Sequence, residues 1–233
     1  LTCFIISIFG IFQIPGEGRV SAPFEGEGGE PNTFGGYLVF MAAIAGGLSI
    51  KTENAKLKTL LPVLILIIVL TLLFTRSRSS YIALISACFT LGLLLRHRII
   101  ILSLMTTALL LSPILLPSAV KDRILFTFTQ EESAGQVQIG DLHLDTSTSA
   151  RILTLKSLLK DYPKHPLLGY GITGHRFIDA QYPKVLIETG LLGLIAFLYL
   201  LYSIFKMAIT HMKAVKIPLF KGLTIGFLAG FMG

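Results

Sequence analysis

The feature that most constrains this chain is a series of long, nearly uninterrupted apolar blocks. A helix that crosses a bilayer needs about 20 apolar residues, with a lower limit of about 17. Blocks of this kind, some cut by a chain end, are residues 1–14, 34–50, 59–75, 79–95, 99–116, 185–205 and 218–233. Their apolar residues do not follow the periods of a half-buried helix or strand. We therefore expect an all-α fold, a polytopic transmembrane helix bundle.

Composition agrees with a membrane protein. The chain is 53% hydrophobic and 14% charged, with a mean hydropathy of +0.75, whereas about a quarter of the residues of a soluble domain are charged. Cys3 and Cys88 both lie in apolar blocks, so we expect neither a disulfide framework nor a metal site from them. The chain starts at Leu1 and stops inside an apolar run, so we expect a fragment that lacks helices at both ends.

The lysines and arginines predict the orientation in the membrane. Alternating the spans places nine of them on one side, with Glu53 as the single acid there, and the positive-inside rule makes this side cytoplasmic. The nine are Lys51, Lys56, Lys58, Arg96, Arg98, Lys206, Lys213, Lys216 and Lys221. This asymmetry explains the net charge of +7, so we do not expect nucleic-acid binding.

The domain organisation follows from the same alternation. We expect transmembrane helices over residues 1–116, one long extracytoplasmic loop over 117–184, and transmembrane helices over 185–233. Within the loop, "QVQIGDLHLD" alternates apolar and polar residues about Gly140-Asp141, which predicts a β-hairpin.

An amphipathic helix is predicted in the same loop by "STSARILTLKSLLKDYP". Ser147, Thr148 or Ser149 can cap its start. Its predicted apolar face consists of Ile152, Leu155, Leu158 and Leu159. Such a helix would lie on the membrane surface or cover a cavity between spans.

Arginines on the outer side are the first candidate site residues. Arg76 and Arg78 lie in "TRSRSS", between two spans. Arg76 can snorkel to lipid phosphates. Arg78 is followed at once by a span, so a fixed anionic partner is expected, either an acid of the protein or a ligand phosphate. A guanidinium binds phosphate oxygens through a planar fork.

Two further arginines lie on this side. Arg151 is expected in the first turn of the amphipathic helix, where its charge opposes the helix dipole. The alternative role for Arg151 is a solvated surface charge. Arg19, in "GRVSAPF", is a third extracytoplasmic candidate.

The segment from His165 to Leu201 holds the remaining candidates. His175 and Asp179 are four residues apart and would share a face if that stretch is helical. Glu188 lies four residues into a span, where an unpaired charge is costly. It either pairs with an arginine and locks two helices, or takes part in the chemistry. The patterns of metal, P-loop and dinucleotide sites are missing, so we expect no metal and no cofactor.

The order of four segments resembles a known family. The segments are "GRVSAPFEGEGGEPNTFGGYL", "TRSRSSYIALISA", "TSARILTLKSLLKDYPKHPLLGYGITGHRF" and "DAQYPKVLIETGLLGLIAFLYLL". Together they resemble the O-antigen ligase and polymerase superfamily of bacterial membrane glycosyltransferases, over roughly residues 19–205. The last two segments carry the most specific part of the resemblance.

The resemblance implies a metal-independent transferase of the bacterial cytoplasmic (inner) membrane, with an extracytoplasmic active face. It would move a saccharide from an undecaprenyl-diphosphate-linked donor to an acceptor saccharide or glycolipid. Arg78 and Arg151 match the family's arginines and would bind the diphosphate, with Arg19 beside them and with Arg76 and Glu188 in support. The implied partners are these substrates, membrane lipids and other polysaccharide-assembly membrane proteins.

One position departs from the ligase pattern. Ligases have "HN" where this chain has Asp179-Ala180, nine residues before Glu188. This favours a polymerase over a ligase, and leaves the catalytic base open between Asp179 and His175. The competing hypothesis is a transporter or flippase that holds the same diphosphate without cleaving it. A transporter should carry ionisable groups near the bilayer centre, whereas these groups lie at the outer surface.

Overall fold

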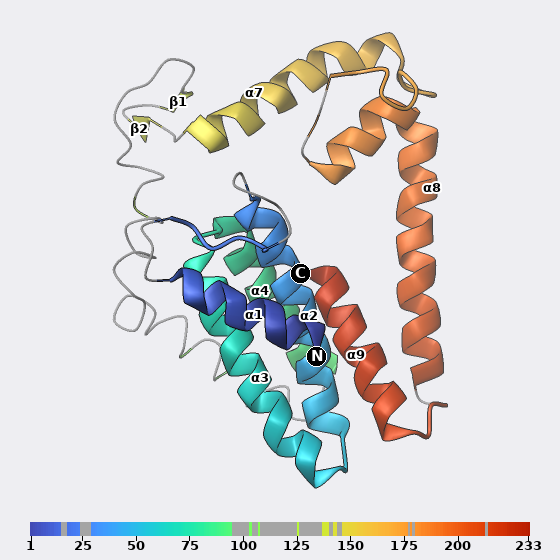
Figure 1. Cartoon of the computed structure of the whole chain (residues 1–233). Helices are drawn as coiled ribbons and strands as arrows, with labels where there is room; N and C mark the ends of the chain where they lie inside the picture. The colour runs from blue at the N-terminus through green and yellow to red at the C-terminus, as the bar shows by residue number, and fades with distance from the viewer. Residues whose placement is uncertain are drawn as a thin grey trace. The chain divides into compact units, whose positions relative to one another are not determined.

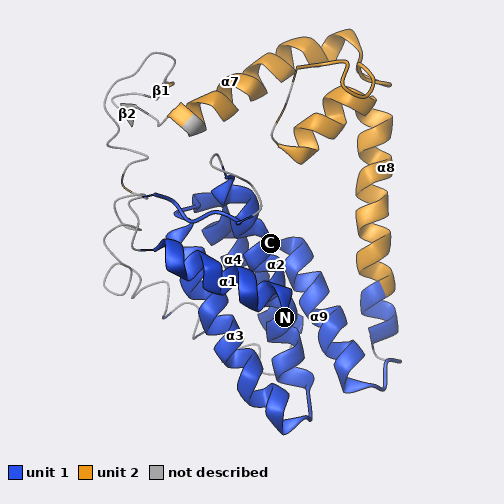
Figure 2. Cartoon of the chain, in the orientation of Figure 1, with its two compact units in different colours: residues 1–124, 208–233 blue, residues 125–207 orange. Residues whose placement is uncertain are grey.

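The computed structural model describes residues 1–14, 18–23, 29–94, 103, 107, 125, 137–139, 142–143, 146–176, 178, 180–212 and 214–233. Most of the predicted span 99–116, and Asp179, lie outside these residues. The chain divides into two compact units, residues 1–124 with 208–233 and residues 125–207 (Figure 2).

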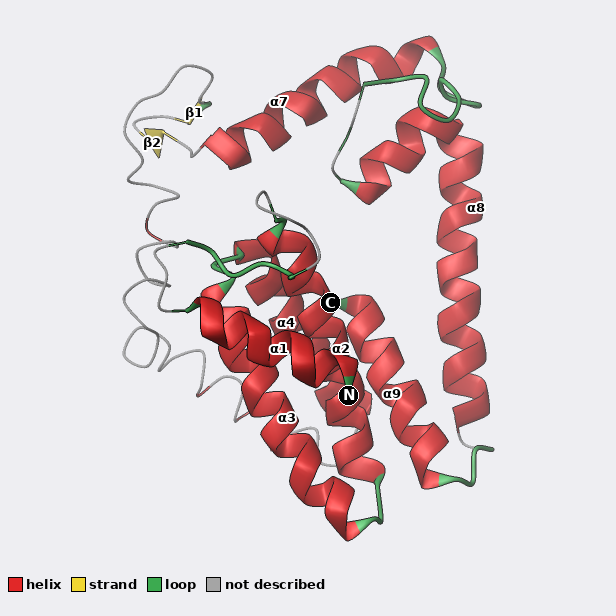
Figure 3. Cartoon of the chain, in the orientation of Figure 1, coloured by secondary structure: helices red, strands yellow, loops and turns green. Residues whose placement is uncertain are grey.

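The first unit contains five of the described helices (Figure 1). They are α1 (Thr2–Gln13), α2 (Pro31–Lys51), α3 (Ala55–Phe74), α4 (Arg78–Leu94) and α9 (Pro218–Met232). The predicted all-α class is confirmed, because helices dominate the described residues (Figure 3). Of the described helices, α2, α3 and α8 (Gln181–Met212) are long and apolar enough to cross a membrane. The helices α1, α4 and α9 are apolar but shorter.

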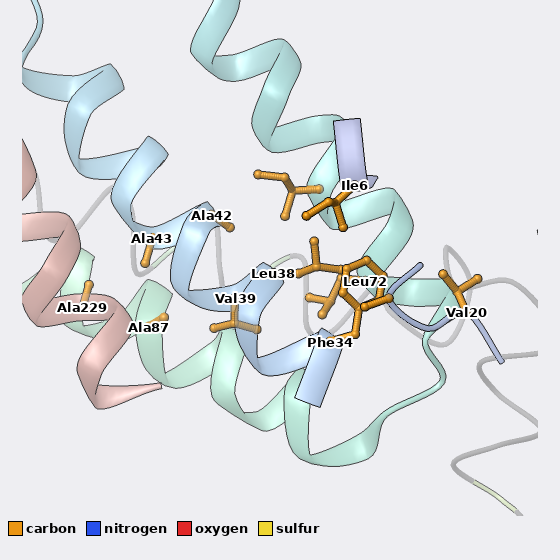
Figure 4. Close-up of a cluster of buried hydrophobic side chains, with 12 residues drawn as sticks. Ile6, Val20, Phe34, Leu38, Val39, Ala42, Ala43, Leu72, Ala87 and Ala229 are labelled. Carbon is orange, nitrogen blue, oxygen red and sulfur yellow. The ribbon is translucent and has the colours of Figure 1, made fainter. Parts of the chain in front are cut away.

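The core of the first unit is centred on α2 and includes residues of α1, α3, α4 and α9 (Figure 4). Phe34 and Leu38 of α2 and Leu72 of α3 are buried there, and Val20 closes the cluster from the segment before α2. The helix α9 packs along α2, where glycines such as Gly47 let the two backbones touch. These contacts pack α3 and α9 against α2.

The second unit contains α7 (Thr146–Asp161), a 3₁₀ turn η1 (Tyr162–Lys164) and most of α8. Before α7, the two-residue strands β1 (Gln138–Ile139) and β2 (Leu142–His143) pair in antiparallel fashion. Ile139 lies opposite Leu142, so the predicted strand pairing is confirmed, and the predicted turn residues Gly140 and Asp141 lie outside the described residues.

The amphipathic helix is confirmed as α7, with two corrections. It starts at Thr146, so the three predicted capping residues lie inside the helix, and Ser149 Oγ instead accepts the Val137 N–H at 2.9 Å. The earlier start also puts Arg151 in the second turn rather than the first. Of the predicted apolar face, Leu158 is buried, whereas Leu155 and Leu159 are exposed.

The predicted span 185–205 also differs from the structure. In its place, α8 runs from Gln181 to Met212 and is broken at Gly190. Gly190 has φ of 67° and ψ of −168°, a conformation that is almost confined to glycine. The break separates a short first segment from a long apolar one, and it has a specific cause in the loop before α8.

Candidate functional site

The turn between α3 and α4 is fixed by its own side chains. Thr75 Oγ1 donates to the Leu72 carbonyl at 2.7 Å at the end of α3. Ser77 Oγ accepts from the Ser80 N–H at 3.4 Å, as an N-cap side chain does. The sequence "TRSRSS" therefore ends one helix and starts the next, and Arg76 and Arg78 lie on either side of Ser77.

Arg19 is tied to this turn although it is far away in sequence. Its Nε donates to the Thr75 carbonyl at 2.9 Å, and its Nη2 donates to Asn32 Oδ1 at 3.0 Å. The next residue, Val20, donates its N–H to the Phe74 carbonyl at 3.2 Å. The structure thus brings Arg19 to the turn that carries Arg76 and Arg78.

The same end of the unit collects two helix N-termini. Gly35, in the second turn of α2, lies so close to Ser80 of α4 that a Cβ on Gly35 would collide with the serine side chain. Helix N-termini carry partial positive charge, so α2 and α4 add to the field of the arginines. Arg76 has φ of 49°, and its buried Nε has no hydrogen-bond acceptor among the described residues. This end of the unit, called the arginine turn below, suits an anion.

A second candidate region lies in the other unit, where the loop before α8 pairs with the break in that helix. The N–H groups of Tyr170 and Gly171 donate to the carbonyls of Ile187 and Glu188, both at 2.9 Å. Beyond the break, the Leu191 N–H donates to the Pro166 carbonyl at 2.8 Å. The broken helix therefore recovers hydrogen bonds from the loop, as buried backbone groups require.

Two glycines make this pairing possible. A Cβ on Gly169 would lie 2.5 Å from the Glu188 carbonyl carbon, and a Cβ on Gly190 would strike the Leu167 carbonyl. Both residues also have positive φ. The motifs "HPLLGYG" and "ETGLLG" are thus the two halves of one structural unit, called the backbone clamp below.

His175 is held next to the clamp by an acid that the sequence patterns did not single out. Its Nε2 lies 3.2 Å from Asp161 Oδ2, at the end of α7, and its side chain is only 9% exposed. The ring packs against Tyr170, whose hydroxyl donates to the Asp161 carbonyl at 3.0 Å. Nδ1 of His175 is buried and has no partner among the described residues.

Asp161 also binds Lys164, with Oδ1 2.8 Å from Nζ. The hydrogen bonds from Lys164 and then from His175 lower the pKa of Asp161, and Asp161 in turn raises the pKa of Lys164. The sequence signal for the pair of Asp161 and Lys164 is their spacing of three residues. No spacing linked Asp161 to His175, because a turn and a loop separate them.

Glu188 makes a different contact from the one expected. Its Oε1 accepts the Thr173 N–H at 3.3 Å, and no arginine contacts it in the described part of the chain. The expected ion pair with an arginine stays a prediction. Nearby, the guanidinium of Arg176 donates to Ser157 of α7.

The predicted site residues therefore fall into two groups. Arg19, Arg76 and Arg78 meet at the arginine turn of the first unit. His175 and Glu188 lie at the backbone clamp of the second unit. Arg151 lies ten positions before Asp161 on α7, about 15 Å along the helix from it.

Asp179 lies outside the described residues. Among the residues that the structure describes, no group of three His, Cys, Asp or Glu side chains forms a candidate metal site.

Comparison with known proteins places this arrangement in a family. The family model described as O-antigen ligase matches residues 63–198. The match covers the arginine turn from α3 onward, all of α7, the backbone clamp and the start of α8. No curated protein and no solved structure matches the chain.

Proposed function

The chain belongs to the O-antigen ligase family, and from this we propose the reaction in detail. Membership implies a membrane-embedded enzyme of the glycosyl-transferring type that acts on lipid-linked saccharides. We propose that this protein transfers a saccharide from an undecaprenyl-diphosphate-linked donor to an acceptor sugar. The reaction takes place at the outer face of the bacterial cytoplasmic membrane.

The observation that carries the proposal is the arginine turn. The leaving group is a lipid diphosphate, and its negative charge grows as the bond between sugar and phosphate breaks. Arg76 and Arg78, with the N-termini of α2 and α4, supply positive charge at one place. Donors fixed before the reaction stabilise such a developing charge. Arg19 contributes by holding the turn through Thr75 and Asn32. The role of Arg151 in diphosphate binding stays a prediction from the family resemblance.

The acceptor hydroxyl needs a base. Nε2 of His175 contacts Asp161, and Nδ1 of His175 is buried. Neither ring nitrogen is therefore open to an acceptor hydroxyl in this arrangement, and His175 is better suited to holding the loop. We therefore propose that Asp179, four residues further on, takes the proton from the acceptor hydroxyl. The acceptor oxygen forms the new bond to the sugar, and undecaprenyl diphosphate leaves with the bonding electrons. This scheme uses no metal ion.

Polymerase activity is the finer proposal. An acid at position 179, where ligases have a histidine, supports joining of saccharide units rather than transfer to a glycolipid core. The acceptor is then another lipid-linked saccharide, and other polysaccharide-assembly proteins of the same membrane are the partners. A flippase holding the same diphosphate is the alternative, and it would release no undecaprenyl diphosphate.

The experiment compares Arg78→Ala and Asp179→Asn with the unchanged chain in proteoliposomes that contain a lipid-linked saccharide. We expect the unchanged chain to form longer saccharides and to release undecaprenyl diphosphate in equal amount. Each variant should lose at least about 100-fold in rate. For Arg78→Ala the reason is the loss of one donor to a developing negative charge, and for Asp179→Asn it is the loss of the general base, which contributes about 10²–10⁴-fold. Lys206→Ala, at the far end of α8, is the matched control and should keep full activity.

Two results would contradict the proposal. Normal saccharide lengthening by Arg78→Ala would remove the arginine turn from the chemistry. Movement of the lipid-linked saccharide across the bilayer without any released diphosphate would support the flippase. Insertion of each variant into the membrane is checked by its resistance to extraction at high pH.

A further inference from the structure

The helix α7 presents an unusual surface in the described part of the second unit. One of its leucines, Leu158, is 1% exposed and packs against Ile178 and Ile187. Three others face away from this contact: Leu153 is 46% exposed, Leu155 is 47% exposed and Leu159 is 63% exposed. An exposed helix surface in water is normally polar, so these leucines need another explanation.

Cations lie among the exposed leucines. Positions 152, 155, 156, 159 and 160 follow the i, i+3, i+4, i+7, i+8 spacing of a single helix face. This face consists of Ile152, Leu155, Lys156, Leu159 and Lys160. Both lysines are exposed, and Leu153 borders the face. It combines apolar side chains with positive charge.

No acid shares this surface. Asp161 is the single acid of α7, and it binds Lys164 and His175 instead. Thr154 and Ser157, on another side of the helix, are half-buried. Positive charge among exposed leucines, with no carboxylate of α7 on the same face, is complementary to the headgroup region of a membrane with anionic lipids. A protein partner of ordinary composition would need acids of its own to match both lysines.

We propose that α7 lies in the interface of an anionic phospholipid leaflet. Leu155 and Leu159, with Leu153 at the edge, enter the boundary between headgroups and acyl chains. Lys156 and Lys160 reach the lipid phosphates, since a lysine stem can lie along apolar surface while its ammonium stays at the polar level. The helix thereby sets the height of the adjoining backbone clamp, and of His175 and Glu188, at the membrane surface. This role is independent of which reaction the protein performs.

The test places a spin label on α7 of the full chain in lipid nanodiscs that contain phosphatidylglycerol and phosphatidylcholine. Cys3 and Cys88 are first replaced by serine so that one cysteine remains for labelling. Leu159→Cys reports the exposed face, and Thr154→Cys is the matched control on another side of the helix. Collision rates with oxygen, which concentrates in lipid, are compared with those of a water-soluble nickel chelate.

We expect the label at position 159 to meet oxygen more often than nickel, at a depth of about 5–10 Å below the headgroups. The label at position 154 should show a lower ratio of oxygen collisions to nickel collisions, as expected for a group outside the acyl-chain region. Replacing both lysines, as Lys156→Glu and Lys160→Glu, should weaken docking at least about 25-fold, because each lysine near an anionic surface contributes roughly fivefold in binding. The label at position 159 then shifts toward nickel.

Three outcomes would overturn the proposal. A label at position 159 that meets nickel more often than oxygen would show that α7 faces water. A label that is immobile and meets neither reagent would show that another part of the chain or a partner protein covers the face. An unchanged depth after the two lysine substitutions would exclude anionic headgroups as the ligand. Replacing phosphatidylglycerol by phosphatidylcholine around the unsubstituted chain gives the same test from the lipid side.

Discussion

Gly190→Ala is the change that should most specifically open the backbone clamp. Gly190 has φ of 67° and ψ of −168°, and a side chain held in such a region costs about 1–3 kcal/mol. The new Cβ would also strike the Leu167 carbonyl. We expect loss of the hydrogen bonds from Leu191 to Pro166 and from Leu192 to Leu167, at 2.8 and 3.3 Å, each worth about 1 kcal/mol.

These contributions give a local destabilisation of about 3–5 kcal/mol. Amide hydrogen exchange of the segment that contains Tyr170 and Gly171 is the assay, because both N–H groups donate to carbonyls in front of the break. Since each 1.4 kcal/mol is about a factor of ten, exchange there should accelerate by at least on the order of 100-fold. Exchange within α2 should stay unchanged.

Gly171→Ala is the matched control. Gly171 has φ of 84°, but a Cβ at this position would meet no atom within 4 Å, so the variant tests the backbone strain without the collision. Its effect should be about 1–2 kcal/mol, smaller than that of Gly190→Ala. Equal exchange rates in Gly190→Ala and the unchanged chain would refute the clamp, and a larger effect of Gly171→Ala would refute the role given to the collision.

Two further predictions concern the candidate site. Lys164 and His175 lower the pKa of Asp161, so folding favours the ionised carboxylate. The stability gained from this ionisation is present above the ordinary pKa of an aspartate. It is lost as the pH falls through the lowered pKa of Asp161 in the folded chain. Amide hydrogen exchange of the segment around His175 should therefore accelerate under acid conditions, and Asp161→Asn should remove that pH dependence. A pH dependence that persists in the variant would contradict the role given to Asp161.

Arg19→Lys should open the arginine turn, because an ammonium cannot span both the Thr75 carbonyl and Asn32. Faster exchange at Val20 and Thr75 measures this opening, and Lys51→Arg is a control expected to have no effect.

The predicted elements agree with the structure where the sequence signal was local. Apolar blocks mark α1 to α4, α8 and α9, and the start and stop residues placed α7 nearly correctly. The predicted start of α7 differs from the structure because helix capping competes with tertiary contacts. Ser149 Oγ accepts a hydrogen bond from the Val137 N–H instead of capping α7. The break in α8 was missed because its cause, the loop from Pro166 to Gly171, precedes the helix in sequence.

The candidate site divides in the same way. The sequence placed Arg76 and Arg78 together in one short turn and Arg19 far from them, and only the contact of Arg19 with Thr75 joins Arg19 to that turn. Asp161 was not a candidate at all, since its link to His175 crosses a turn and a loop, and the two residues are 14 positions apart in the chain. The roles of Arg78 and Asp179 in the reaction stay predictions, and the saccharide-lengthening experiment tests them.

The sequence by itself determined the membrane-embedded helical class and the family, because both depend on apolar length and on motifs that read along the chain. Tertiary structure alone decided which polar groups meet. Backbone groups of Tyr170, Gly171 and Leu191 pair across a helix break, and Asp161 turns from a surface acid into the partner of a buried histidine. Such pairings depend on how close a loop lies to a helix that follows it in the chain. The pairing here requires glycine at both Gly169 and Gly190, because a Cβ at either position would collide with the opposite backbone.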